Sequence, residues 1–309
     1  MFDLLVIGEI NPDLILRDPD IVPVFGQAEK LVEDAKLTIG SSSVITACGA
    51  ARLGLKVSFI GLVGDDQFGR FMLRAMEERG IDTSACIVEP RVPTGMSVIL
   101  GGSNDRAILT YPGTIPLLEA EQIDRTMLEQ ARHLHVGSYF LLDNLRPELP
   151  EIFTDARERG LTTSLDTNWD PAEEWDLNAV LAHVNVFFPN KNEVLLITGE
   201  DDFTEAVDLL SEQVPTLAVK LGVQGGLARR GKESVNAPIL PVKVVDTTGA
   251  GDSFNAGFLY GYLNNFSLKD SLVLACVCGS LSTRAAGGTA AQPTLEEALG
   301  AIEERDFKQ

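Results

Sequence analysis

The chain has 309 residues, so we expect either one large α/β domain or one domain with a small appendage. Hydrophobic residues make up 45% of it and aromatic residues only 6%, which suits an α/β enzyme better than an all-β sandwich. The formal net charge of −20 argues against binding to a nucleic-acid backbone, because such binding needs a basic surface.

Features that report on the cellular compartment point to the cytoplasm. No basic segment followed by an apolar one opens the chain, and it contains no apolar run of about 18 residues, so we expect neither export nor a membrane partner. The cysteines Cys48, Cys86, Cys276 and Cys278 show no CxxC spacing. Because Cys276 and Cys278 lie in an apolar run, we expect buried thiols rather than a metal or redox site.

The first third of the chain predicts a buried strand, an irregular excursion and a helix–strand–helix unit. Pro19, Pro23 and Gly26 interrupt the excursion, for which we expect edge strands only. The predicted ranges are 3–8 for the first strand, 14–36 for the excursion, 43–53 for a helix, 57–64 for a second strand and about 67–79 for a second helix.

The remainder of the chain alternates between strands and helices. Residues 96–111 predict a β-hairpin with GGSND as its turn, because two β-rich arms flank that polar stretch. Strands are predicted at 133–137, 162–166, 184–190 and 216–222, and C-terminal helices at about 251–263, 268–284 and 294–304. This alternation predicts βαβ units and a mostly parallel sheet covered by helices.

These elements predict one main domain with two β-rich insertions. The main α/β domain comprises residues 1–12, 37–92 and 116–309. The insertions, residues 13–36 and 93–115, could pair into a small sheet that covers the edge of the central sheet as a lid.

A glycine-rich turn, DTTGAGD at 246–252, is the strongest local signal for chemistry. We expect a strand at 242–245 before it and a helix after it. Glycines 249 and 251 would let a ligand approach the backbone, and the helix N-terminus would favour an anion. The pattern alone leaves two interpretations open, an anion site with Asp252 beside it or a loop that merely starts a helix.

Two other nucleotide-binding signatures are absent. Residues 226–233, GLARRGKE, match a Walker A motif only up to GxxxxGK, because Glu233 replaces the Ser or Thr that would bind Mg²⁺. We interpret this stretch as a hairpin turn between strands. After the first strand the chain reads IGEINPD, which is no Rossmann fingerprint.

The stretch DTTGAGDSFNAGF resembles the C-terminal signature of the ribokinase-like carbohydrate kinases, the PfkB family. Further stretches agree with that family in order: ARLG (51–54), GLVGDDQFG (61–69), TG (94–95) with the hairpin after it, LDTNWDP (165–171), FPNKNEV (188–194) and VKLGVQGG (219–226). The resemblance implies a three-layer α/β/α fold with a mostly parallel central sheet and a small β-sheet lid.

The resemblance also implies catalytic roles around the turn. Asp252 would be the base that accepts the proton of a sugar hydroxyl, and the helix N-terminus would keep its carboxylate ionised near neutrality. The amides of Gly249, Ala250 and Gly251, with that of Asp252, would form the anion hole for the developing charge.

ATP and Mg²⁺ are the cofactors that the resemblance implies. Lys220, Gly222, Gly225 and Thr248 would lie in the ATP site. Asn190 and Glu193 would hold Mg²⁺, largely through water, although the NKNE stretch by itself reads as a polar helix start.

A monovalent cation is a further implication for family members that need potassium. Asp246 and Thr248 match the positions that help to bind it, and carbonyls around residues 285–288 would complete the site.

The acceptor site is predicted from several segments. Asn11 and Asp13 resemble the N-x-D pair that grips sugar hydroxyls; the alternative is a turn at the end of a strand. Gly40 and Ser41 would lie at the sugar as well. Arg106 could reach a sugar or an acidic substituent, or simply belong to the hairpin turn.

The same region departs from the family pattern. In GSSSVI, Ser41 replaces a glycine and Ile45 stands where a sugar-binding asparagine is expected. Asp170 stands where many relatives carry arginine. These changes leave the identity of the sugar open.

We therefore expect an ATP-dependent sugar kinase that transfers the γ-phosphate to a primary hydroxyl of a small sugar or sugar acid. Alternatives are an adenosine-type nucleoside kinase, for which residues 14–36 offer only Phe25 as an aromatic contact, and a non-catalytic sugar sensor. The resemblance further suggests a homodimer formed through the lid strands.

Overall fold

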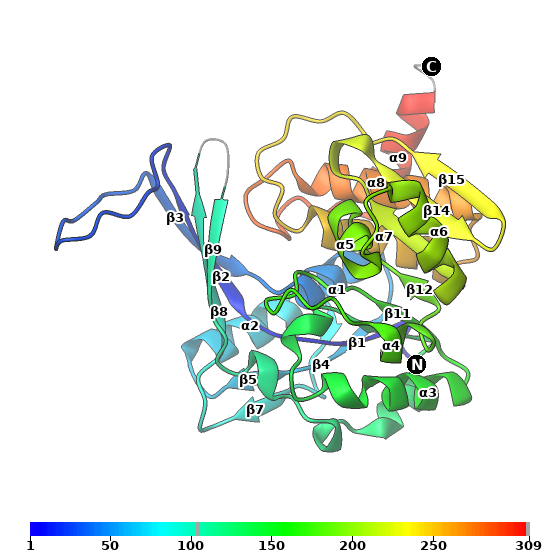
Figure 1. The fold of residues 1–309 in the computed structure, drawn as a ribbon. Coiled ribbons are helices and arrows are strands. Elements are labelled where there is room, and N and C mark those ends of the chain that lie inside the picture. Colours follow the sequence, from blue (N-terminus) through cyan, green and yellow to red (C-terminus); the bar gives the residue numbers. More distant parts are fainter. Residues whose placement is uncertain (103–105, 307–309) are drawn as a thin grey trace.

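The computed structural model describes residues 1–102 and 106–306 (Figure 1). Within them the central sheet has nine strands in the order β15-β14-β13-β12-β11-β10-β1-β4-β6. The strands are β1 (Leu4–Ile7), β4 (Val57–Ile60), β6 (Ile81–Asp82), β10 (His133–Val136), β11 (Thr162–Leu165), β12 (Val186–Phe187), β13 (Thr216–Lys220), β14 (Gly226–Arg230) and β15 (Glu233–Ala237). The strands from β6 to β13 run parallel, and β14 and β15 are antiparallel. The predicted mostly parallel sheet is therefore confirmed.

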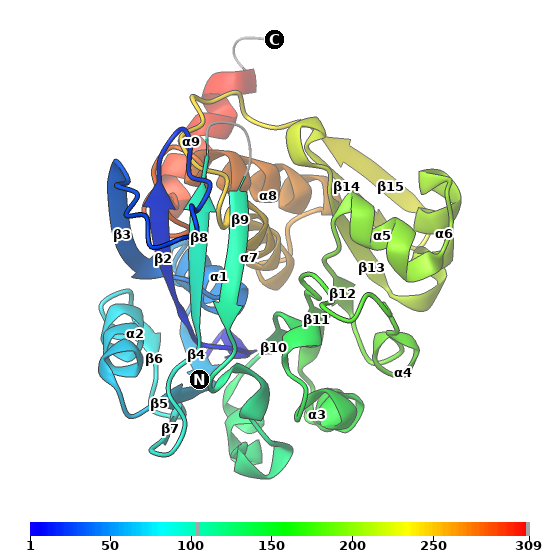
Figure 2. The same ribbon diagram turned by 60° about the vertical axis from the view of Figure 1, so that its left-hand side comes forward.

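Helices cover both faces of this sheet (Figure 2). One face carries α1 (Ser42–Arg52), α2 (Gln67–Glu77), α7 (Ala250–Leu263), α8 (Leu268–Ser282) and α9 (Leu295–Asp306); the other carries α3 (Leu149–Glu158), α4 (Asn178–Leu181), α5 (Lys191–Thr198) and α6 (Phe203–Gln213). Strand β1 shows the reason. Leu4 and Val6 pack in the hydrophobic core under the helices of one face, and Leu5 and Ile7 in the core under the helices of the other. Because β1 is buried on both faces, all of its side chains are apolar. The fold is the predicted three-layer α/β/α arrangement.

A second sheet, which we call the small sheet, stands beside the main domain at the left of Figure 1. It comprises β3 (Asp34–Ile39), β2 (Pro12–Arg17), β8 (Met96–Gly101) and β9 (Arg106–Tyr111), in that order. Strand β2 pairs antiparallel with β3 and parallel with β8, so two segments that lie far apart in the sequence form one sheet. Of the predicted GGSND turn, residues 103–105 lie outside the described residues.

Three boundaries differ from the prediction. The 57–64 strand breaks after Ile60, and its second part, β5 (Leu62–Gly64), pairs with β7 (Ile87–Glu89) instead of joining the central sheet. The 184–190 strand is reduced to Val186–Phe187, followed by an isolated bridge between Asn190 and Lys220. The GLARRGKE stretch is mostly strand β14, and only residues 231–232 form the turn to β15. Shorter 3₁₀ helices lie at Ile115–Leu117, Ala120–Gln122, Arg125–Gln130, Tyr139–Leu141, Arg146–Glu148 and Gly222–Gln224.

The predicted strand at 242–245 was wrong. This segment does not join a sheet, and Val244 and Val245 are 57% and 50% exposed. The backbone amides of Val245 and Asp246 instead donate to the carbonyl of Thr283, beyond the end of α8. The β-propensity of the sequence is overridden because this segment lies against a helix end and not beside a strand.

No helix in the described ranges has the length and apolarity required to cross a bilayer.

Candidate active site

Polar side chains gather at the carboxyl edge of the parallel strands. Glu9 follows β1, Asp166 follows β11, Asn190 follows β12 and Lys220 ends β13. Parallel strands end at one edge of a sheet, which is where ligands bind in such folds. Together with the N-termini of α1 and α7 and with the small sheet, these residues line a cavity of about 440 Å³, which we call the polar cavity.

The turn before α7 exposes the start of that helix to the polar cavity. Gly249 has a φ of 72°, and a Cβ there would lie 2.6 Å from the Cα of Gly288, so only glycine fits. No side chain caps α7, whereas Ser41 and Asn190 cap α1 and α5, which border the same cavity. Within residues 1–102 and 106–306, the first-turn amides of α7 thus lack a side-chain cap, although the amide of Ala250 donates to the carbonyl of Thr247 at 3.2 Å. The helix dipole adds to the attraction of this turn for an anion.

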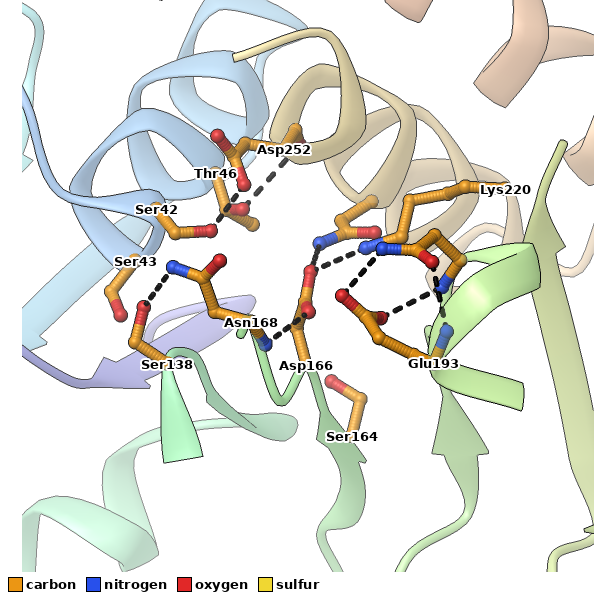
Figure 3. A network of polar contacts seen from close by, with 12 residues as sticks. Ser42, Ser43, Thr46, Ser138, Ser164, Asp166, Asn168, Glu193, Lys220 and Asp252 are labelled. Carbon is orange, nitrogen blue, oxygen red and sulfur yellow. Dashed lines mark hydrogen bonds and ion pairs between the residues drawn. The ribbon is translucent and has the colours of Figure 1, made fainter. Parts of the chain in front are cut away.

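Asp252 lies in the first turn of α7 and also lines the polar cavity. Figure 3 shows the Ser42 hydroxyl donating a hydrogen bond to Oδ1 of Asp252. Burial raises the pKa of Asp252 to about 7, and the negative charge of Asp166 adds to this, against the lowering effects of Ser42 and Lys220. Burial thus opposes the stabilisation of the carboxylate that we expected from the helix N-terminus, and a pKa of about 7 leaves the group partly ionised near neutrality.

Lys220 forms a buried ion pair at the centre of this network (Figure 3). Its Nζ lies 2.7 Å from Oδ2 of Asp166, which also accepts a 2.5 Å hydrogen bond from Asn255. Burial alone would lower the pKa of Lys220, but the carboxylates of Asp166 and Glu193 outweigh it and raise the pKa. In the opposite sense, burial would raise the pKa of Asp166, but Lys220 and the hydrogen bonds lower it. Both groups are thus held in their charged forms.

The ammonium of Lys220 also lies close to the start of α7. A Cβ built on Gly251 would be 3.3 Å from Cδ and 3.8 Å from Nζ of Lys220. The charge therefore lies beside the first-turn amides of that helix.

Asn190 and Glu193 form a capping box at the start of α5. Oδ1 of Asn190 accepts from the amide of Glu193 at 3.0 Å, and Oε2 of Glu193 accepts from the amide of Asn190 at 2.8 Å. Both residues also line the polar cavity, where burial raises the pKa of Glu193 to about 7. Across residues 1–102 and 106–306, no three His, Cys, Asp or Glu side chains converge on a metal position. Oxygen donors with room for water suit Mg²⁺, which retains much of its hydration in proteins.

The opposite end of the polar cavity contains Asn11 and Asp13. Nδ2 of Asn11 lies 3.4 Å from Oγ of Ser97 on β8. A Cβ on Gly40 would come within 2.1 Å of Oδ1 of Asp13, so Gly40 makes room for this carboxylate. Burial raises the pKa of Asp13 to about 7, although the positive charge of Arg106 opposes the rise.

Ser41 has a structural role that its sequence position did not reveal. Its φ of 65° lies in the left-handed region, which favours the glycine that the family pattern has there. The hydroxyl donates to the carbonyl of Glu9 at 2.7 Å and accepts from the amide of Val44 at 3.0 Å. These bonds hold α1 against the end of β1 and offset the unfavourable backbone conformation.

Four further residues of this site, Glu9, Ser42, Asp166 and Asn255, had no role predicted from the sequence. The carboxylate of Glu9 is buried, accepts from the hydroxyls of Ser43 at 2.5 Å and Ser138 at 2.8 Å, and has its pKa raised by that burial. Asp166 stands in the LDTNWDP stretch, which offered the one local signal among the four. The roles of Glu9, Ser42 and Asn255 follow only from the tertiary structure, which brings the end of β1 together with α1 and α7.

Two arginines of the small sheet contact the turn before α7. Nη2 of Arg17 on β2 lies 2.6 Å from Oδ2 of Asp246, and Nη1 of Arg106 on β9 donates to Oγ1 of Thr248 at 2.8 Å. A second cavity, of about 490 Å³, lies between these arginines and residues 244–248.

A third cavity is apolar and adjoins the polar one. Its volume is about 450 Å³, and its lining includes Val223, Gly225, Ile239, Leu240, Pro241, Val242, Phe254 and Cys276. Lys220, Gly222 and Gly251 line both this apolar cavity and the polar cavity. The two cavities therefore meet at the start of α7.

Comparison with known proteins decides the family. Residues 1–295 match the model of the pfkB family carbohydrate kinases. The chain belongs to this family. It is therefore a carbohydrate kinase, a phosphotransferase with an alcohol group as acceptor.

Relatives of this pfkB kinase cover most of its length. It is 33% identical over 228 residues to an uncharacterized sugar kinase of Archaeoglobus fulgidus. This match covers 72% of this chain and 89% of that protein. It is 29% identical to the 2-dehydro-3-deoxygluconokinase of Bacillus subtilis, over 88% of this chain and 89% of that one. A crystal structure of a putative ribokinase II from E. coli has the same fold, with a TM-score of 0.87, 22% identity and coverage of 98% and 100%.

Of the three departures from the pfkB pattern, Ile45 and Asp170 differ in their surroundings. Ile45 lines the polar cavity, and its side chain lies beside Gly249 and Gly288. Asp170 instead accepts hydrogen bonds from the amides of Ala172, Glu174 and Trp175, each at 2.9 Å, and so stabilises its own loop. Ser41 and Ile45 are thus the departures that border the polar cavity.

Proposed function

We propose that this kinase is ATP-dependent and transfers the γ-phosphate to a primary hydroxyl of a small sugar or sugar acid. The observation that carries the proposal is the meeting of a polar and an apolar cavity at the uncapped start of α7, with Asp252 beside it. Phosphoryl transfer needs a positioned hydroxyl, neutralisation of charge and little covalent help from the protein.

The apolar cavity suits the adenine of ATP. Gly222 and Gly225 form part of its wall, and the phosphate chain would extend toward Thr248 and the amides of Gly249, Ala250 and Gly251. Asn190 and Glu193 would hold Mg²⁺ largely through water. When bound, this ion neutralises phosphate charge.

Asp252 is suited to act as the base. With a pKa raised to about 7, the carboxylate can accept the proton of the acceptor hydroxyl near neutral pH. The amides at the start of α7 and the ammonium of Lys220 would stabilise the charge that develops on the transferred group. Closure of the small sheet as a lid would exclude water, which otherwise competes with the sugar for the phosphoryl group.

The acceptor end favours a sugar over a nucleoside. Asn11 and Asp13 offer an amide and a carboxylate for vicinal hydroxyls. Among the described residues that line the polar cavity there is no aromatic side chain for a base to stack on. The B. subtilis relative is named for a sugar acid, and Arg106 offers a positive charge to such an acceptor.

A screen of acceptors tests the proposal. ADP release with Mg²⁺ and ATP is measured for pentoses, hexoses, sugar acids and nucleosides, and the phosphate ester formed is identified by ³¹P NMR. We expect turnover with a sugar or sugar acid. A preference for nucleosides would support a nucleoside kinase, and saturable sugar binding without turnover would support a sugar sensor.

The variant Asp252→Asn tests the assigned base. We expect kcat to fall by about 10²-fold or more, while the binding of ATP and sugar, measured by thermal shift, is retained. Unchanged turnover would show that Asp252 is not the base.

Pairing of two small sheets in a homodimer is the assembly that we propose. On β9, Leu109 and Tyr111 share a face of the small sheet and are 61% and 51% exposed, and such a dimer would cover them. Light scattering coupled to size exclusion should give the mass of a dimer, and Leu109→Glu should shift it to that of a monomer. A wild-type monomer would refute the proposal.

A further inference from the structure

The carboxylate of Asp246 is surrounded by hydrogen-bond donors. Oδ1 accepts from the amide and the hydroxyl of Thr248, at 3.0 and 2.8 Å. Oδ2 accepts from the amide of Gly287 at 2.9 Å and from Arg17 at 2.6 Å. A carboxylate offers about four lone-pair positions, so these four donors use its full capacity.

The neighbouring loop is contacted in a similar way. Gly287 presents an amide, not a carbonyl, to Asp246. The carbonyl of Ala286 accepts a hydrogen bond from Nζ of Lys36 at 3.0 Å. Thus two of the oxygens expected to bind potassium here, a carboxylate oxygen of Asp246 and the carbonyl oxygen of Ala286, instead accept from positively charged side chains.

Both cations belong to the small sheet and lie on one face of it. Arg17 is on β2 and Lys36 on β3, where Lys36 pairs with Ile15. Ile15 and Arg17 are two residues apart on one strand and share a face, so Arg17 and Lys36 are diagonal neighbours. The small sheet thus brings two positive charges to the joint between the turn at 246–249 and the loop at 285–288.

We propose that Arg17, assisted by Lys36, supplies the positive charge that a monovalent metal ion would bring to this joint, so that the kinase works without potassium. The inference rests on the proposed kinase function. The residues present do not fit the potassium site that the family resemblance implied. Arg17 is accordingly a positioning residue, because it acts on the turn that leads into α7.

The same contacts tie the small sheet to the phosphoryl-transfer site. Asp246 and Thr248 directly precede Gly249, the residue that starts α7. If the small sheet moved away, Asp246 would lose the positive charge of Arg17 beside it. The ordering of the anion-binding turn is then coupled to closure over the sugar, a coupling that a freely diffusing ion would not provide.

Potassium dependence of the wild type and of Arg17→Met tests the proposal. Activity is measured in tetramethylammonium buffer and in K⁺ buffer of equal ionic strength. The wild type should show the same kcat/KM in both. Arg17→Met should have a lower kcat/KM in tetramethylammonium, and K⁺ should raise that kcat/KM by about 5-fold or more. The reason is that removal of the guanidinium opens the carboxylate of Asp246 to the second cavity.

Matched variants separate this effect from a general loss of charge. Arg17→Lys should remain independent of potassium. Arg70→Met removes an arginine from an exposed ion pair with Asp65, far from the turn in sequence, and should behave as the wild type. Activation of the wild type by K⁺ would overturn the proposal. So would an Arg17→Met variant whose activity is the same in K⁺ and in tetramethylammonium.

Thermal unfolding provides a readout that does not depend on activity. K⁺ should raise the Tm of Arg17→Met relative to tetramethylammonium and leave that of the wild type unchanged. This result would support the inference even if no acceptor were phosphorylated. A K⁺-specific stabilisation of the wild type would refute the inference even in an active kinase.

Discussion

The ammonium of Lys220 lies 2.7 Å from the carboxylate of Asp166 inside the protein, with only 15% and 3% of the two side chains exposed. The pair places a fixed positive charge next to the start of α7, and Asn255 and Asn168 hold its anionic partner. Because a buried charge without its partner destabilises a fold, we expect the pair to contribute to the stability of the protein.

Removing either charge of the Lys220–Asp166 pair should destabilise the fold, and removing both should restore it. Lys220→Met should lower the free energy of unfolding by about 3–5 kcal/mol, because it leaves the buried carboxylate of Asp166 without its cation. Asp166→Asn should cost less, because Glu193 still attracts the ammonium of Lys220. The double variant should recover most of this loss and yet have a kcat reduced by about 10²-fold. Urea unfolding and steady-state kinetics measure both effects. Additive losses in the double variant would contradict the coupling.

Ser42 should set the acid limb of the pH–rate profile. Its hydroxyl lowers the pKa of Asp252, so Ser42→Ala should raise that pKa and shift the acid limb of kcat to higher pH. At alkaline pH, where the base is ionised in both proteins, kcat should be nearly equal. Ser42→Thr keeps a hydroxyl and should restore the profile. A uniform loss of kcat at all pH values would indicate a packing defect instead.

Asp252→Asn should stabilise the unliganded protein at alkaline pH. The folded-state pKa is raised to about 7 from 3.8, so the folded protein favours the protonated carboxyl. The stability gained in this way is complete below the unfolded pKa and is lost as pH rises through about 7. Relative to the wild type, the variant should gain up to about 4 kcal/mol near pH 8 and nothing near pH 4. Thermal unfolding across pH tests this, and a gain independent of pH would contradict it.

Gly249→Ala should impair catalysis beyond its cost in stability. The new methyl group would press on Gly288 and move the first amides of α7. Gly231 in the β14–β15 turn has a φ of 57° and open space around it, so Gly231→Ala controls for the left-handed backbone alone. Gly231→Ala should lose about 1–2 kcal/mol of stability. Gly249→Ala should lose more, because its methyl group also meets the backbone of Gly288, and only this variant should lose kcat. Equal kinetics in the two variants would show that the turn geometry is unimportant.

Much of the fold could be predicted locally. A strand buried on both faces is apolar throughout, as in Leu4–Ile7, and a helix on one face shows its own period, so most elements were assigned within a few residues. The segment 242–245 failed because its β-propensity lacked a strand partner. Strand pairing is a property of two segments, and one segment cannot reveal it.

By itself the sequence determined the reaction class. It did so through the ordered stretches that resemble the pfkB family, because DTTGAGD alone left both an anion site and a simple helix start open. What that stretch fixes locally is short-range geometry, in which a left-handed residue precedes a helix and a carboxylate lies in its first turn. The tertiary structure decided the partners and the electrostatics. Ser42 meets Asp252 across 210 residues of chain, and Arg17 meets Asp246 across 229. Burial, which exists only after these segments pack together, then set the pKa of Asp252 against the trend expected from its helix.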